Sequence, residues 1–310
     1  MKQSLKATKK ESVWWMILKL FVFLAVLSFV VVKLIHVDWT KMKAFHLEHG
    51  WALVAAIVLV IPNQWLEYLK WERIARTLVQ DQQQIRKAFW GGVASGFLSP
   101  NGWGNFIGRM VFFRKRDRLF ITLATGLANV SQLLPTLVFG CFALMLSVGY
   151  EWKTVVASSL IALLFILLYA FWEHLISSKK TRNRNLRKLQ FVKYRLHEFK
   201  WPLAVYSFLR FQVFSLQYVL LFVSFGYDDW WTLFLNVWLI YLMTSFVPSL
   251  WSGKLIIRET AAIMVFAGSA VAVPDIVLIS LLIWIINLVL PAAISSFVWI
   301  PFNKSKHVVD

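Results

Sequence analysis

Two arginines lie inside apolar segments, each downstream of a proline-containing break. Arg109 belongs to the apolar segment 88–113, and Arg258 belongs to the apolar segment 230–269. A guanidinium in an apolar environment is costly, so it faces a partner or a wet cavity. Its planar fork also suits the oxygens of a phosphate group. We therefore predict that Arg109 and Arg258 converge on one phosphate, assisted by the positive ends of broken helices.

Each arginine also has a simpler interpretation. Arg109 precedes the basic run that starts at Arg114, and it could merely begin that cluster. Arg258 is followed by Glu259, whose carboxylate could neutralise it. The sequence leaves these alternatives open.

The breaks themselves are built from residues that interrupt helices. Proline lacks an N–H group and glycine favours turns, so these residues shape the two breaks. They are Pro100, Asn101, Gly102, Gly104, Asn105 and Gly108 in the first segment, and Pro248, Ser249 and Gly253 in the second. The spacings Gly92-x-x-x-Gly96 and Gly104-x-x-x-Gly108 predict close helix packing.

A second group of polar residues lies in other apolar segments: Asn63, Asn129, Gln132 and, beside Arg258, Glu259. We predict that they line a polar cavity. For Asn63, a network of side chains at a helix end is the alternative. The six histidines are scattered, and neither metal-ligand spacing nor a nucleotide-binding loop is present. We therefore expect no enzyme, no cofactor and no metal site.

Composition places these residues in a membrane. Of the 310 residues 59% are hydrophobic, while the formal net charge is +18. The mean hydropathy is +0.64. A soluble domain is only about half apolar, and the basic residues stand in short clusters between long apolar runs. This is the positive-inside pattern of a membrane protein, and it argues against nucleic acid as a partner.

Six segments are long and apolar enough to cross a bilayer: 13–35, 51–71, 119–148, 153–176, 201–226 and 274–300. Placing the basic loops inside puts both chain ends in the cytoplasm. The first segment is too long for a signal peptide, so we expect it to be retained. The predicted organisation is a basic tail at 1–12, one transmembrane domain at 13–302 and a second cytoplasmic tail at 303–310.

The two broken segments do not fit as single crossings, because each lies between loops assigned to the same side. We predict re-entrant helical hairpins, the first entering from inside and the second from outside. Each follows a crossing and precedes another, so the fold class is an all-α polytopic membrane protein with an inverted repeat. Irregular backbone at that depth requires surrounding protein or a water-filled cavity. The alternative is eight full crossings, because the arms of the second segment are longer.

These breaks carry a resemblance to a known family. Residues 100–109, PNGWGNFIGR, are similar to the Pro-Asn-x-x-Gly-Glu-x-x-Gly-Arg motif of the lysylphosphatidylglycerol synthase transmembrane region, the flippase-like family. Residues 248–253, followed by Ile257-Arg258-Glu259, are similar to the second motif of that family. Asn105 stands where the family usually has Glu.

The resemblance implies a multi-pass protein of the bacterial plasma (inner) membrane that handles anionic lipids. The chain ends shortly after its last apolar segment, so we expect no soluble aminoacyltransferase domain. The expected function is translocation of a phospholipid or phosphate-bearing lipid between leaflets. Two alternatives remain: a non-catalytic membrane partner of a separate soluble transferase, and a membrane-embedded transferase that uses the arginine pair and Glu259.

Overall fold

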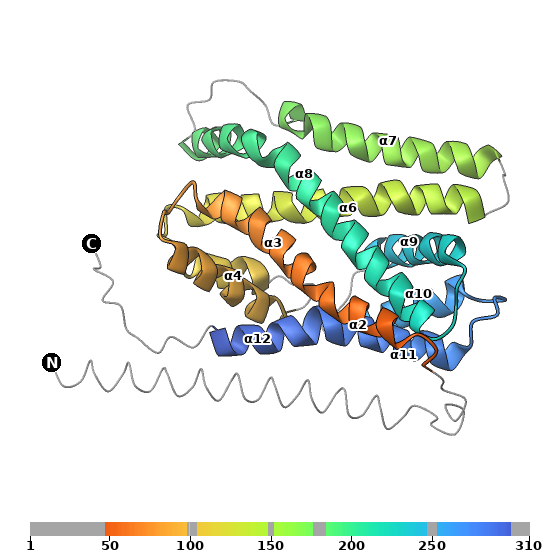
Figure 1. Cartoon of the computed structure of the whole chain (residues 1–310). Coiled ribbons are helices and arrows are strands. Elements are labelled where there is room, and N and C mark those ends of the chain that lie inside the picture. The colour runs from red at the N-terminus through yellow and green to blue at the C-terminus, as the bar shows by residue number, and fades with distance from the viewer. Residues whose placement is uncertain are drawn as a thin grey trace.

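The described part of the protein is helical throughout. The structure, a computed structural model, describes residues 47–97, 99, 104–147, 152–175, 184–246 and 253–298. Its elements are α2 (Gly50–Val58), α3 (Val60–Ala75), α4 (Gln82–Phe97), α5 (Gly104–Met110), α6 (Arg118–Ser147), α7 (Trp152–Leu175), α8 (Arg184–Ser224), α9 (Trp230–Phe246), α10 (Gly253–Val265), α11 (Val273–Trp284), the π-helix η3 (Ile285–Val289) and α12 (Leu290–Val298) (Figure 1). The predicted crossing 13–35, both tails and the break residues Pro100, Asn101, Gly102, Pro248 and Ser249 lie outside the described residues.

Four helices are long and apolar enough to cross a membrane: Gly50–Ala75, Arg118–Ser147, Leu196–Ser224 and Val273–Ser295. They confirm four of the predicted crossings and the all-α membrane class. The 24-residue α7 corresponds to the predicted crossing 153–176 and contains a shorter apolar stretch, Val155–Phe171. Most large apolar side chains of this stretch are exposed, as expected for a helix whose outer surface contacts lipid.

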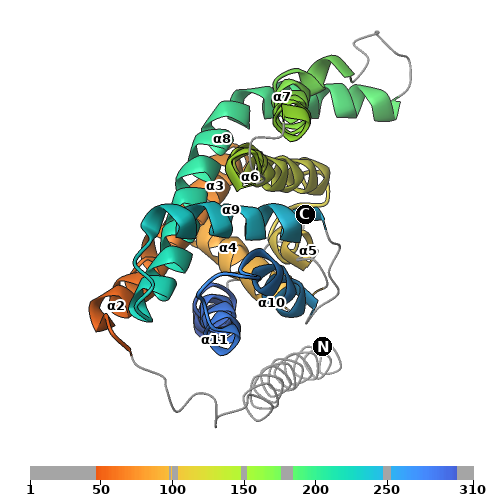
Figure 2. The ribbon, with the colours of Figure 1, turned by 90° about the vertical axis from the view of Figure 1, so that its right-hand side faces the viewer.

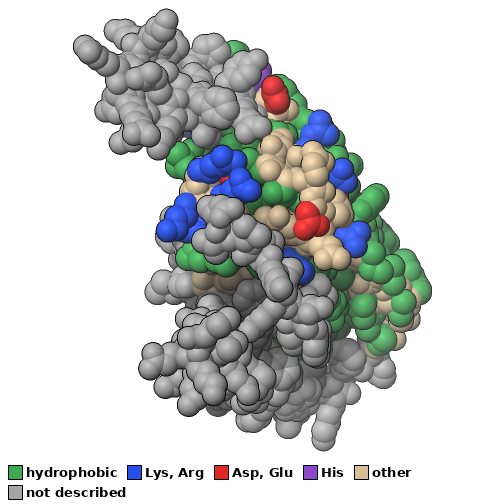
Figure 3. Space-filling view, turned by 90° about the vertical axis from the view of Figure 1, so that its left-hand side faces the viewer, with side chains coloured by type: hydrophobic (Ala, Val, Ile, Leu, Met, Phe, Trp, Pro, Cys, Tyr) green, Lys and Arg blue, Asp and Glu red, His purple; other side chains and the backbone are tan. Residues whose placement is uncertain are grey.

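Exposed basic side chains gather at one end of the bundle. They lie in the turns that join α3 to α4 and α5 to α6 and on the neighbouring helix ends: Arg73, Arg76, Arg86, Arg114, Lys115, Arg116 and Arg118. Figure 3 views this basic end. At the opposite end, Glu48 lies against Gly226, Asp228 is 3.6 Å from His49, and Asp275 accepts a hydrogen bond from Tyr227. We call this second set the acidic end.

The first broken segment forms a hairpin of α4 and α5. Both of its ends lie at the basic end, where the indole N–H of Trp71 donates to the backbone oxygen of Ile85 at 2.9 Å. Ser95 Oγ lies 2.6 Å from the carbonyl oxygens of both Gly91 and Gly104, so its one hydroxyl proton is shared between the two arms. The hairpin therefore enters and returns on one side, as predicted.

The second broken segment, α9 and α10, has both ends at the acidic end. α9 starts directly after Asp229, whose carboxylate accepts from the backbone N–H of Thr232 at 3.2 Å and caps the helix. Ala272, after α10, donates its backbone N–H to Tyr227 Oη at 3.1 Å. α10 has 13 residues, about 20 Å at 1.5 Å per residue, which is short of the roughly 30 Å hydrocarbon core. A re-entrant hairpin therefore fits this segment better than two full crossings.

The two halves of the chain pack reciprocally. α2 and α3 run from the acidic to the basic end and pack against α8, which runs in the opposite direction. α6, which follows the first hairpin, packs against α9 of the second, while α12, which follows the second hairpin, packs against α4 of the first. Figure 2 looks down this stack, with α7 outermost. Helices of one half thus have antiparallel counterparts in the other half, and each half packs the helix that follows its hairpin against the hairpin of the other. This arrangement is expected of an inverted repeat.

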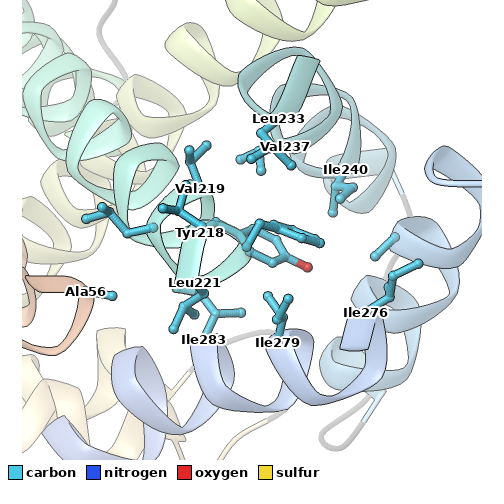
Figure 4. Packing of buried hydrophobic residues seen from close by; sticks show 14 of the residues in the cluster. Ala56, Tyr218, Val219, Leu221, Leu233, Val237, Ile240, Ile276, Ile279 and Ile283 are labelled. Atoms are coloured by element: carbon cyan, nitrogen blue, oxygen red, sulfur yellow. The ribbon is translucent and has the colours of Figure 1, made fainter. Parts of the chain in front are cut away.

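The hairpins meet inside the bundle. Phe97, at the end of α4, packs against a buried cluster made of Leu255, near the start of α10, and Leu281 and Trp284 of α11. Trp284 is the central residue of the span Val273–Ser295. Close to this contact, the main apolar core joins α8, α9, α11 and α2 around the buried Tyr218 (Figure 4). The inner ends of α4 and α10 thus lie deep in the molecule.

The glycine spacings of the first hairpin serve close packing. A Cβ on Gly108 would collide with Gly91 O and Ser95 Oγ, and one on Gly104 would collide with Ser95 O. The backbones of α4 and α5 therefore approach more closely than any larger residue permits, which confirms the packing interpretation of Gly104-x-x-x-Gly108.

We predict that Gly108→Ala destabilises the protein by about 1–3 kcal/mol, because backbone atoms of Gly91, which cannot move aside as a side chain can, obstruct the new methyl group together with Ser95 Oγ. The measurement is thermal unfolding in detergent. Gly126→Ala is the matched control, since its methyl group would meet Phe106 Cε1 at an ordinary 4.0 Å. Equal melting temperatures for the two variants would contradict the close-packed hairpin.

Candidate functional site

The structure places a carboxylate among three cations in the interior of the bundle. Glu67 Oε1 is 3.1 Å from Arg109 Nη2, and Glu67 Oε2 is 3.1 Å from Arg210 Nη1. The same Oε2 lies 3.4 Å from Lys70 Nζ. We call Glu67, Lys70, Arg109 and Arg210 the ion cluster. Three positive charges against one negative charge leave it a formal net charge of +2.

α3 supplies the centre of the cluster through its helical periodicity. Asn63, Glu67 and Lys70 are spaced by four and three residues, so they share one face of the helix. Asn63 and Lys70 are almost fully buried, at 0% and 2% exposure. That face turns towards α6 and α8, which pack on α3.

The first hairpin supplies Arg109, which is 1% exposed. Its side chain crosses α4 at Gly92, where any Cβ would lie within 2.9 Å of Arg109 Cγ and Nε. Its guanidinium carbon lies 4.7 Å from the centre of the Trp71 ring, a cation–π contact. Arg109 Nε is buried and has no hydrogen-bond partner among the described residues. The close glycine contact thus allows a buried arginine to reach across the hairpin to α3.

The second half of the chain supplies Arg210 from the middle of the span Leu196–Ser224. Its Nε donates to Asn63 Oδ1 at 2.9 Å, and its guanidinium carbon lies 4.9 Å from the centre of the Phe214 ring. Arg210 therefore contacts two side chains of α3, Asn63 and Glu67, from the centre of a helix that is long and apolar enough to cross a membrane.

Amides extend the cluster in two directions. On one side, Asn63 Nδ2 donates to Asn287 Oδ1 at 2.5 Å, and Asn287 belongs to the π-helix η3. Such helices are rare and are frequently found at functional sites. On the other side, Lys70 Nζ donates to Gln132 Oε1 at 3.4 Å, and Gln132 Nε2 donates to Ser207 O at 3.3 Å. A continuous polar network therefore joins helices of both halves.

Two of the four residues predicted to line a cavity belong to this network. Asn63 lies at the middle of the span Gly50–Ala75, so its interpretation as part of a helix-end network is wrong. Gln132 lies at the middle of Arg118–Ser147 and contacts Lys70. Asn129 is exposed on α6 and lies outside the network. Glu259 is half-buried on α10.

The two predicted phosphate-binding arginines have different surroundings. The described contacts join Arg109 to Glu67 but do not join it to Arg258. Arg258 is half-buried on α10, and its Nε is a buried atom without a hydrogen-bond partner in the described part of the chain. Among the break residues, Gly104 and Gly108 hold the hairpin together, Asn105 places a buried, partnerless Oδ1 beside Gly92, and Gly253 begins α10.

The sequence prediction missed Lys70, Arg210 and Asn287, and it did not include Glu67 among the site residues. A signal existed for Arg210, because a charged residue inside a predicted crossing is itself a functional candidate. Lys70 lies close enough to the basic end to be taken for a helix-end residue. No property of the sequence marks Asn287 as part of a π-helix.

Within the described ranges, no group of three His, Cys, Asp or Glu side chains could hold a metal ion. The cluster and the network around it consist of basic, amide and carboxylate side chains. Comparison of the chain with family models, curated proteins and solved structures found no match.

We predict that Glu67→Gln destabilises the protein strongly, by about 3–5 kcal/mol, because it leaves the buried Lys70 and Arg109 and the partly buried Arg210 without their carboxylate. The measurement is unfolding in detergent followed by circular dichroism. Combining Glu67→Gln with Arg109→Gln should recover part of the loss, since one uncompensated cation is removed.

The matched control for this prediction is Glu72→Gln on the same helix. Glu72 pairs with Arg76, whose side chain is 57% exposed, and such a pair contributes about 0–1 kcal/mol. If Glu67→Gln were no more destabilising than Glu72→Gln, the ion cluster would not be a buried electrostatic unit.

Proposed function

We propose that this protein is a flippase-like membrane protein that translocates a phospholipid or another phosphate-bearing lipid between leaflets. The observation that carries the proposal is the ion cluster with its net charge of +2, contributed by α3, the first hairpin and α8. A charged group buried in a membrane protein is expensive and marks a substrate or ion pathway by default. Arginine suits phosphate through bidentate contacts, and lysine adds a point charge.

The architecture supplies a means of alternating access. Arg109 belongs to a hairpin that ends in the interior, so its attachment to Glu67 depends on how the hairpin packs against α3. A movement of the hairpin would separate Arg109 from Glu67 and open the cluster to a headgroup. The equivalent hairpin in the other half enters from the opposite end and carries Arg258. Movement of one repeat against the other around a central site is the usual mechanism of inverted-repeat transporters.

The proposal includes a place in the cell. We place the protein in the plasma (inner) membrane of a bacterium, with the basic end and both chain ends in the cytoplasm. The concentration of exposed Lys and Arg around the turns that join α3 to α4 and α5 to α6 supports this orientation. The similarity of residues 100–109 to the flippase-like motif supports the same family assignment and the same lipid chemistry.

The test is transbilayer movement of labelled anionic phospholipids in proteoliposomes. Wild-type protein should accelerate movement, and Arg210→Gln should reduce the rate at least tenfold, because a lost charge-assisted hydrogen bond is worth roughly 1.5–3 kcal/mol. Arg76→Gln, at the exposed basic end, is the matched control and should retain the wild-type rate. Arg258→Ala tests separately whether the second hairpin contributes to the site.

Folded wild-type protein that moves none of the lipids would overturn the transport proposal. The alternative, a membrane partner of a soluble lipid-modifying transferase, would then be tested by isolating the protein with its bound partners. If the Arg210→Gln variant instead moved lipid at the wild-type rate, the ion cluster would not be the transport site.

A further inference from the structure

The ion cluster has an excess of two positive charges at a depth where charges are hard to balance. Glu67 is the one carboxylate among its contacts in the described structure, and it is shared by Lys70, Arg109 and Arg210. Lys70 and Arg109 are 2% and 1% exposed, so water compensates little of their charge. In a medium of low dielectric constant, a ligand that brings two negative charges is therefore favoured over a ligand that brings one.

We propose that the ion cluster selects a lipid that carries a phosphate monoester in preference to phosphodiester lipids. This inference rests on the proposed function and names its substrate class. A phosphate monoester carries about −1.5 to −2 charges at pH 7 and has three terminal oxygens. A phosphodiester carries a single negative charge and has two. The monoester therefore matches the net charge of the cluster, and it offers one oxygen to each of the three cations.

The geometry around Glu67 supports this match. Its two carboxylate oxygens already serve three cations, so Arg210 and Lys70 share Oε2. Arg109 has an additional donor, Nε, which is buried and has no hydrogen-bond partner among the described residues. The cluster thus has more donor capacity than its own carboxylate uses. A headgroup with three oxygens would take up this capacity beside Glu67.

The selectivity test compares phosphatidic acid with phosphatidylmethanol of identical acyl chains. The two lipids differ by one methyl group, which converts the monoester into a diester. Proteoliposomes at pH 7.5 should move labelled phosphatidic acid about tenfold faster, the ratio expected for one additional charge-assisted contact. In detergent, the short-chain forms should show the same order in raising the melting temperature of the protein.

Two further measurements address the cause of the selectivity. Lys70→Gln lowers the net charge of the cluster to +1, so the preference for phosphatidic acid should fall towards unity, while Lys115→Gln at the exposed basic end should leave it unchanged. Lowering the pH of the wild-type assay to 5 protonates the monoester, whose second pKa is about 6, and should also remove the preference. The second measurement needs no variant and therefore does not depend on how Lys70→Gln folds.

The outcomes separate this inference from the proposed function. If both lipids move at equal rates, transport stands and the monoester selectivity is overturned. If phosphatidic acid alone stabilises the protein and neither lipid moves, the selectivity of the site stands and transport is overturned. If neither lipid moves or stabilises the folded protein, both are overturned.

Discussion

The interior of this protein is organised by the need to balance buried charge. A bilayer supplies no water to solvate Lys70, Arg109 and Arg210, so each must find a partner within the protein. Glu67 meets all three within 3.4 Å. Because these side chains come from α3, from the first hairpin and from α8, the pairing fixes how these elements sit against one another. The amide contacts of Asn63 and Gln132 then extend the arrangement to η3 and α6.

The close packing of the first hairpin is the second part of the same constraint. Arg109 reaches Glu67 only by crossing α4 at Gly92, and α5 lies that close to α4 only because Gly104 and Gly108 have no side chains. Ser95 satisfies carbonyl oxygens on both arms, which is required where no water can do so. Gly104 and Gly108, which belong to the first helix break in the sequence, are therefore also residues that allow Arg109 to reach Glu67.

The reciprocal packing of the two halves explains why a polar network can lie so deep. α6 and α12 each pack against the hairpin of the other half, and Phe97 of the first hairpin packs against an apolar cluster that contains Leu255 of the second. Irregular backbone is thereby kept away from lipid. The same arrangement leaves a polar centre between elements that enter from opposite ends, which is the geometry required for exposing one site to either side. The concentration of exposed basic side chains at one end of the bundle distinguishes the two sides of this centre.

The sequence by itself determined the class of the protein and the existence of its unusual segments. Apolar runs of about 20 residues form helices in a membrane, and clustered proline and glycine residues favour breaks in them, so four crossings and both hairpins could be predicted from local properties. Arg109, Asn63 and Gln132 could be chosen because polar residues in apolar segments are costly. The residues that these side chains contact could not be predicted from the sequence. Glu67 and Arg210 are 143 residues apart, and Asn63 and Asn287 are 224 apart, so their meeting depends on how the two halves pack. Pairing between distant residues leaves no local periodicity in a sequence, and the tertiary structure alone decided that Arg109 contacts Glu67 and Arg210 completes the cluster.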